Sequence, residues 1–237
     1  AMLWPMFLLI VPIWLGGYLG SQRMPLTWVK KSNAFSGAFL FAITVFLWLP
    51  HLTEHSGHEG HEGGLPWGVW IVLGYFLQFA LDSSSKGLEH GHIHSNDKNP
   101  WPAYIGLLIH SLVEGLPLFS LDVTERLPYA ISLAVHNLPI AALLAFWLKQ
   151  CKIPVRQIIF AIIGLSIAAP IGGGLGGFIP SDMPGMESFV GGLVVGIFLH
   201  VSSTILFELQ KDHRMPWRTW VIVVVGLLSG YALSLLH

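Results

Sequence analysis

Eight apolar runs of helical length divide the chain, and they constrain its fold more than any other feature. A helix needs roughly 20 residues to cross a hydrocarbon core about 30 Å thick, and lipid-facing backbone satisfies its hydrogen bonds only in helices or closed barrels. The runs lack the alternation of barrel strands, so we predict an all-α membrane protein. They cover residues 3–20, 34–50, 66–81, 102–120, 128–148, 156–179, 187–209 and 217–236.

The composition agrees with burial in a lipid bilayer. Hydrophobic residues make up 53% of the 237 residues and charged residues only 11%, whereas soluble domains carry about 25% charged residues. The net charge of -1 provides no basic field, so we expect no nucleic-acid partner. The single cysteine, Cys151, excludes an intramolecular disulfide framework and a cysteine-rich zinc module. No long polar segment remains, so residues 1–237 are expected to form one transmembrane domain.

The basic residues are divided unequally between the two sides of the predicted membrane. Eight spans place alternate connections on opposite sides, and eleven of the twelve basic residues fall in one set of connections or at the span ends next to it. Cytoplasmic segments are enriched in Lys and Arg, so this set is assigned to the cytoplasm, and the other set holds only Arg126. We therefore predict eight transmembrane helices with both termini on the extracytoplasmic side. The plasma membrane, the inner membrane of the cell, is the expected location.

A few ionisable residues lie inside the spans, and three of them are expected to converge. His110 and Glu114 are four residues apart in the fourth span, which puts them on one helix face. His136 lies deep in the fifth span and is followed by Asn137 and Pro139. Because an ionisable group at mid-membrane costs several kcal/mol unless it pairs, binds an ion or faces water, each is a candidate functional group.

Two imidazoles and one carboxylate form a set of nitrogen and oxygen ligands. This set suits Zn²⁺ and is open to Fe²⁺, Mn²⁺ or Cd²⁺. The simpler interpretation is a hydrogen bond within one helix between His110 and Glu114, together with a packed, satisfied His136. The cost of burying all three groups on consecutive spans favours a metal site.

The motifs around these residues resemble those of the ZIP family, the zinc/iron-regulated transporter-like metal transporters. The family patterns are H-(N/S)-x-x-E-G in the fourth span and H-(N/E)-x-P-E in the fifth. The matching residues are His110, Ser111, Glu114, Gly115, His136, Asn137 and Pro139. The segments FSGAFLFAITVFLWLP, AAPIGGGLGG and GIFLHVSS are also similar to their ZIP counterparts, so the resemblance extends over the chain. It implies a ZIP-like helix bundle with eight spans.

Two departures from the family pattern concern the metal site. Ile140 stands where the family commonly has a second glutamate, and Val113 replaces a frequent proline. In ZIP proteins with two adjacent metal positions those carboxylates help bridge the ions, so the resemblance implies one dominant ion here. Its expected ligands are His110, Glu114 and His136, with Asn137 or Ser111 as a further oxygen ligand.

Other histidines and acids are candidates for secondary roles in metal movement. His200, in the seventh span, is a candidate ligand or proton relay, although a hydrogen bond to a hydroxyl is commoner for a lone histidine. Glu208 would attract a cation at the cytoplasmic end of that span. Two histidine-dense segments, about 51–65 outside and 86–99 inside, are either weak metal-capture sites or polar linkers. Their histidines are His51, His55, His58, His61, His90, His92 and His94.

The expected function is transport of a divalent metal, with zinc as the first candidate, towards the cytoplasm by alternating access around a mid-membrane site. The metal is the substrate, and we expect no organic cofactor and no enzymatic activity. A homodimer is a candidate assembly. Acid should weaken binding, because protons compete for the ligand lone pairs.

Three alternatives remain open at this point. An intramembrane hydrolase would use zinc to activate water, but the motif HExxH is absent. A cation-diffusion-type exporter usually has six spans and a soluble C-terminal domain. A metal-binding sensor or degenerate transporter without flux is made credible by Ile140.

Overall fold

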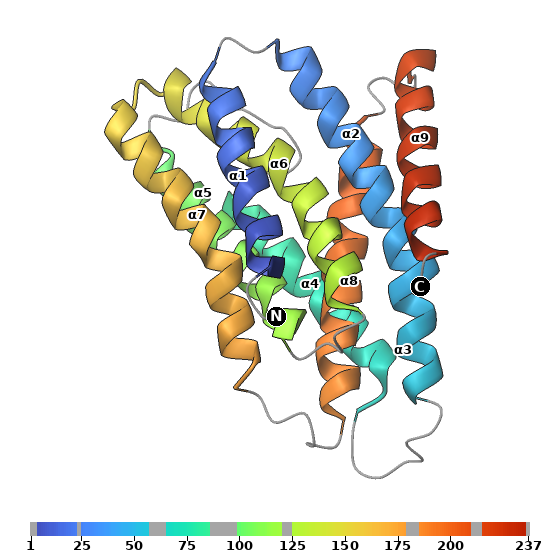
Figure 1. Cartoon of the computed structure of the whole chain (residues 1–237). Coiled ribbons are helices and arrows are strands. Elements are labelled where there is room, and N and C mark those ends of the chain that lie inside the picture. Colours follow the sequence, from blue (N-terminus) through green and yellow to red (C-terminus); the bar gives the residue numbers. More distant parts are fainter. Residues whose placement is uncertain are drawn as a thin grey trace.

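The computed structural model describes residues 4–22, 25–56, 65–85, 99–119, 125–178, 185–209 and 215–235. Throughout these residues the regular structure is helical, without a strand, so the all-α prediction is confirmed (Figure 1). The elements are α1 (Trp4–Ser21), α2 (Leu26–Ile43), the π-helix η1 (Thr44–Trp48), α3 (Leu49–Ser56), α4 (Trp67–Ser85), α5 (Trp101–Gly115), the 3-10 helix η3 (Leu116–Phe119), α6 (Arg126–Gln150), α7 (Val155–Gly176), α8 (Met186–Glu208) and α9 (Trp217–Ser234).

Six helical segments in the described ranges are long and apolar enough to cross a membrane. They are Thr27–Thr53, Trp101–Phe119, Arg126–Gln150, Val155–Gly176, Ser188–Glu208 and Trp217–Ser234. A shorter apolar helix, Pro5–Ser21, coincides with the first predicted run. The third run coincides with α4, which is not among the six; Gln78, Asp82 and the serines at its end lower its hydropathy. The helices identify a multi-pass membrane protein.

One predicted span differs from its helix in where it begins, and another changes helix type near its end. α2 begins at Leu26 instead of residue 34, directly after Pro25, whose backbone is extended. The exposed Lys30 and Lys31 therefore lie within the helix, because a helix continues into water beyond the apolar stretch that marks the lipid. The fourth span is α5 followed by the single 3-10 turn η3.

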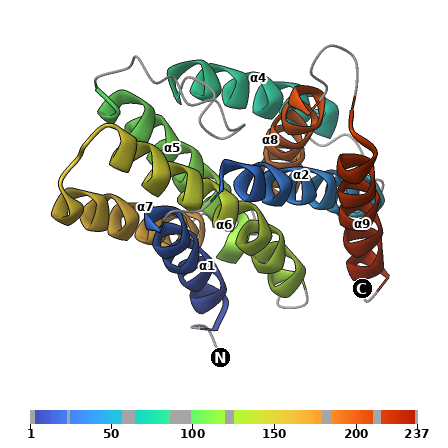
Figure 2. The same ribbon diagram turned by 90° about the horizontal axis from the view of Figure 1, so that it is seen from above.

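The helices pack as two sets that meet in the middle of the molecule. In the first set, α1 packs along α6 and α7, and α5 packs along α7; in the second, α2 packs along α8 and α9, and α4 along α8. The main contacts between the sets join α2 to α6 and α4 to α5. Seen from above, α1 and α7 lie on one flank and α8 and α9 on the other, with α2 and α6 side by side between them (Figure 2).

Glycines bring α5 and α7 to backbone contact. A Cβ atom on Gly172 of α7 would overlap the carbonyl oxygen of Leu112, and one on Gly115 of α5 would overlap that of Ala169. Small residues allow such close approach between membrane helices. The helix that carries His110 and Glu114 is therefore held tightly against its neighbour.

Candidate metal site

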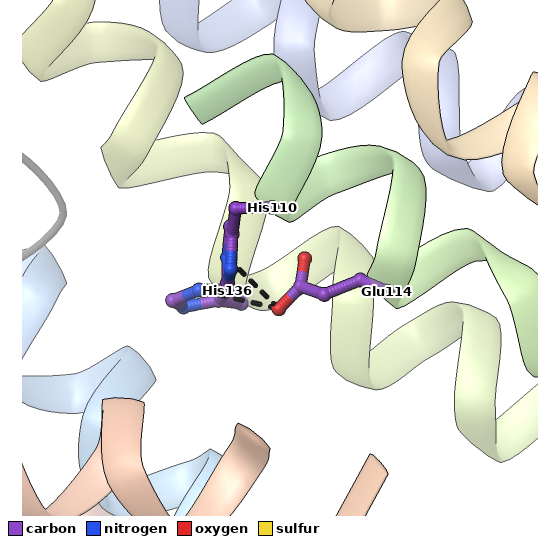
Figure 3. A group of neighbouring side chains, drawn as sticks. All are labelled: His110, Glu114 and His136. Atoms are coloured by element: carbon purple, nitrogen blue, oxygen red, sulfur yellow. Dashed lines mark ion pairs between the residues drawn. The ribbon is translucent and has the colours of Figure 1, made fainter. Parts of the chain in front are cut away.

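Three of the predicted ligands come together at the boundary between the two helix sets. His110 and Glu114 lie one turn apart on α5, and His136 lies beside them on α6 (Figure 3). One candidate ligand atom from each residue lies within 4.8 Å of the other two. All three side chains are buried. A metal ion could be held by three or more His, Cys, Asp or Glu residues whose ligand atoms lie this close together. Within the described part of the chain, His110, Glu114 and His136 form the one group that meets this condition.

Glu114 is the shared partner of both imidazoles. Its Oε1 lies 3.1 Å from Nε2 of His110 and 3.8 Å from Nε2 of His136. The planes of the two rings differ by 77°, with their centroids 6.0 Å apart. Since zinc bonds to nitrogen and oxygen are about 2.0–2.2 Å long, ligand atoms around one ion lie roughly 3–4 Å apart. The observed separations between the imidazole nitrogens and the carboxylate are of this size.

Local features of α5 and α6 fix the backbone that carries the three side chains. The hydroxyl of Tyr129 on α6 donates a hydrogen bond of 2.5 Å to the carbonyl oxygen of Glu114, which ties the end of α5 to α6. Tyr129 is itself packed against Trp48 and Phe198. Pro139, inside α6, has no N–H, so the helix lacks one hydrogen bond next to His136.

The other nitrogen of each imidazole contacts a polar residue from the opposite helix set. Nδ1 of His110 lies 2.8 Å from Oε1 of Gln78 on α4, and Nδ1 of His136 lies 3.5 Å from Oγ of Ser36 on α2. Both partners are buried. Sequence analysis missed them. Gln78 could have been noticed as an amide within an apolar run, whereas a serine in a span gives no comparable signal.

The two predicted oxygen ligands, Ser111 and Asn137, are buried beside the group. Among the described residues, the Ser111 hydroxyl and Oε2 of Glu114 have no hydrogen-bond partner, although buried polar groups normally have one. The amide nitrogen of Asn137 is also a buried atom without a partner. Whether Ser111 or Asn137 supplies an additional oxygen ligand stays a prediction.

His200 is not brought to this group. Its Nε2 lies 3.9 Å from Oδ2 of Asp82 on α4, and its ring makes edge contacts with Tyr75 and Phe79. The structure thus pairs His200 with an acidic residue that sequence analysis had not singled out. Its role as a ligand or proton relay stays a prediction.

At the end of the bundle where α3 meets the start of α6, His51 pairs with Glu125. Nε2 of His51 lies 2.8 Å from Oε1 of Glu125, and the two side chains are 25% and 15% exposed. They line a small pocket together with Leu47 and Trp48 of the π-helix. Glu125 was not predicted, because nothing in the sequence places it near His51.

The remaining candidates concern the histidine-dense segments and the end of α8. Glu208 is the last residue of α8 and is partly buried. The His55 side chain and all of His58, His61, His90, His92 and His94 lie outside the described residues. Metal capture by these two segments therefore stays a prediction.

A comparison with models of known protein families identifies the family of this chain. Residues 100–237, more than half of the chain, match the family model described as ZIP Zinc transporter. The chain belongs to the ZIP family. The matched part contains His110, Glu114 and His136, and no curated protein matches the chain. ZIP proteins are transporters of divalent metals rather than enzymes, so membership supports a membrane-embedded transporter whose substrate is a divalent metal ion.

The position of the second ZIP glutamate is apolar in the structure as well as in the sequence. Ile140 is 1% exposed and belongs to an apolar cluster that includes Ile13 and Leu144. Glu114 is therefore the carboxylate that the three-residue group offers to a metal ion.

Proposed function

We propose that this ZIP protein moves a divalent transition-metal ion, in the first place Zn²⁺, towards the cytoplasm through His110, Glu114 and His136. The observation that carries the proposal is the convergence of two buried imidazole nitrogens on one buried carboxylate, in the part of the chain that matches the family. These are donor types that Zn²⁺ binds. Fe²⁺, Mn²⁺ and Cd²⁺ are the competing substrates, since the same donors accept them.

The charge of the site suits an ion that is held and then released. One ionised carboxylate and two neutral imidazoles offset only half of the charge of a divalent ion. Conduction requires binding strong enough to admit the ion and weak enough to let it leave. With Ile140 in place of a second carboxylate, we propose a single dominant ion, with Ser111 or Asn137 as the additional oxygen donor.

Alternating access provides the route through the membrane. The site lies where α5 and α6 meet α4 and α2, so a movement of one helix set against the other would change the side from which the ion is reached. On the outer side the ion would first meet His51 and Glu125. On the inner side the ion would pass along α4 and α8. These helices carry Asp82, His200 and Glu208.

The proposed topology has eight spans within a single domain of residues 1–237, with both termini outside. Each predicted apolar run coincides with a helix, and the N and C labels both lie in the lower half of Figure 1. The concentration of basic residues in alternate connections supports the orientation. The plasma membrane is the proposed location, and a homodimer is the candidate assembly.

The decisive experiment is zinc flux into proteoliposomes that contain the full chain and a trapped fluorescent indicator. We expect uptake by the wild type, and its loss in His110→Ala and Glu114→Ala, because each substitution removes one of the converging ligands. Parallel runs with Fe²⁺, Mn²⁺ and Cd²⁺ rank the substrates. Ser229→Ala, on the exposed face of α9, is the control for handling and should transport like the wild type. Wild-type uptake rates in either ligand variant would refute the site.

A sensor or degenerate transporter is the second candidate, and Ile140 is the observation that favours it. A site with a single carboxylate can bind a metal without coupling that binding to movement. Zinc binding to the purified protein without flux in any of the metal gradients would select this alternative.

A further inference from the structure

The hydrogen bond between His110 and Gln78 crosses the boundary between the two helix sets. His110 belongs to α5 and Gln78 to α4, and their Nδ1 and Oε1 atoms lie 2.8 Å apart. The two side chains are 1% and 0% exposed. A distance of this size is that of a well-formed hydrogen bond, and in a buried setting such a bond is stronger than in water.

The orientation of the Gln78 amide sets the position of the imidazole proton, because its oxygen faces Nδ1 of His110. A neutral imidazole carries one N–H, and an amide oxygen can only accept a hydrogen bond. The proton of His110 therefore lies on Nδ1, which donates to Gln78, and the lone pair lies on Nε2. That nitrogen faces Oε1 of Glu114 at 3.1 Å. Two electron-pair donors that face each other at this distance are stabilised by a cation bound to both.

We propose that Gln78 is a positioning residue of the metal site, which holds His110 in the tautomer that binds a metal through Nε2. In metal sites, the second nitrogen of a ligating histidine commonly donates to an oxygen, which orients the ring and raises its basicity. Gln78 supplies that oxygen from a helix that carries none of the three ligands. The inference rests on the proposed function, because it assigns a role within the same site.

Ser36 provides a natural comparison. It contacts Nδ1 of His136 at 3.5 Å, the long end of the hydrogen-bonding range. A hydroxyl can either donate or accept, so this contact selects no tautomer. The orienting effect therefore belongs to Gln78, and removal of the Ser36 hydroxyl should have a smaller consequence.

The location of Gln78 makes the site depend on helix packing. The orienting oxygen stays in place only while α4 lies against α5, one of the main contacts between the two helix sets. Separation of the sets at this level would release Nδ1 of His110 from the amide. The affinity for the metal would then fall at the moment when the ion has to leave.

The test measures zinc uptake against zinc concentration for Gln78→Leu and Gln78→Glu. We expect Gln78→Leu to raise KM by about 10- to 100-fold, the usual effect of losing such an outer partner, with a smaller change in the maximal rate. Gln78→Glu should keep KM within a few-fold of the wild type, because a carboxylate also accepts the Nδ1 proton. Ser36→Ala should stay within a few-fold. Thr44→Val removes a buried hydroxyl that donates to the carbonyl oxygen of Leu40 in its own helix turn, and it should resemble the wild type.

A purely structural role for Gln78 predicts the opposite order. Leucine would then be tolerated because it fills the same space, whereas a second buried carboxylate would be harmful. The proposal would be overturned if Gln78→Leu had the KM of the wild type. It would also be overturned if KM in Gln78→Glu were raised as much as in Gln78→Leu.

A spectroscopic measurement keeps the proposal testable if Gln78→Glu does not fold. Nitrogen-15 NMR of histidine-labelled, zinc-loaded protein distinguishes a protonated Nδ1 from a protonated Nε2, and the His110→Asn variant identifies the His110 signals. We expect a protonated Nδ1 in the wild type and a mixture of tautomers in Gln78→Leu. A wild-type protein protonated on Nε2 would contradict the inference.

Failure of the proposed function gives a different result. In that case the wild type carries no zinc, or His110→Ala carries as much as the wild type. If only the present inference fails, flux and its dependence on His110 persist, and Gln78→Leu behaves like Thr44→Val.

Discussion

The ligand group shows which residue-scale contacts a sequence can predict. His110 and Glu114 belong to one helix, so their spacing alone places them on one face. His136 was added because a buried imidazole on the next span needs a partner. Gln78, Ser36 and the other cross-helix partners were not predictable in this way, because they depend on which helices pack together and at what level.

The apolar residue Ile140 offers a direct test at the residue scale. Ile140→Glu adds a carboxylate four residues from His136 on α6, so a bound ion would be more fully neutralised. We expect KM for zinc to fall by about tenfold, equivalent to roughly 1.4 kcal/mol of added binding free energy, and the maximal rate to fall because release slows. The measurement is proteoliposome uptake at varied zinc concentration.

The control for this substitution is Ile140→Gln, because the glutamine side chain has a shape similar to that of glutamate but carries no charge. It should not lower KM. Both variants place a polar group in an apolar cluster, so any shared loss of stability is separated from the effect of charge by comparing them. Equal KM values in the two variants would show that the added carboxylate does not reach the ion.

At the scale of the elements, the helices were predictable because a membrane demands long apolar runs. Their ends were less predictable, since the apolar run marks the lipid and the helix can extend past it, as α2 does after Pro25. The break of the second span into α2, η1 and α3 was also missed, because apolarity does not report a change in helical hydrogen bonding.

The close contact between α5 and α7 gives a prediction at this scale. Gly172→Ala places a Cβ against the carbonyl of Leu112 and should destabilise the protein by about 1–3 kcal/mol, as overpacking does. Gly174 lies on the same helix with nothing within 4 Å of its added Cβ, so Gly174→Ala is the matched control. Thermal unfolding in detergent should show a fall of several degrees for the first variant only. A fall of the same size in both would mean that contact with α5 does not determine the effect, because alanine is itself a better helix former than glycine.

The orientation of the whole molecule can be tested with its own single cysteine. Cys151 follows α6 at the end of the bundle assigned to the cytoplasm, and it is partly exposed. A membrane-impermeant maleimide should label it in inside-out vesicles and leave it unlabelled in right-side-out vesicles. Thr53→Cys, introduced with Cys151→Ser, places a thiol at the exposed position on α3 and should show the reverse pattern. Labelling of both thiols from one side would contradict a topology in which the second span and the fifth span end on opposite sides of the membrane.

The same orientation decides which polar end of the bundle the incoming ion meets first. Alternating access needs Glu114 to be reached from each side in turn. One end carries His51 with Glu125, and the other carries Asp82 with His200.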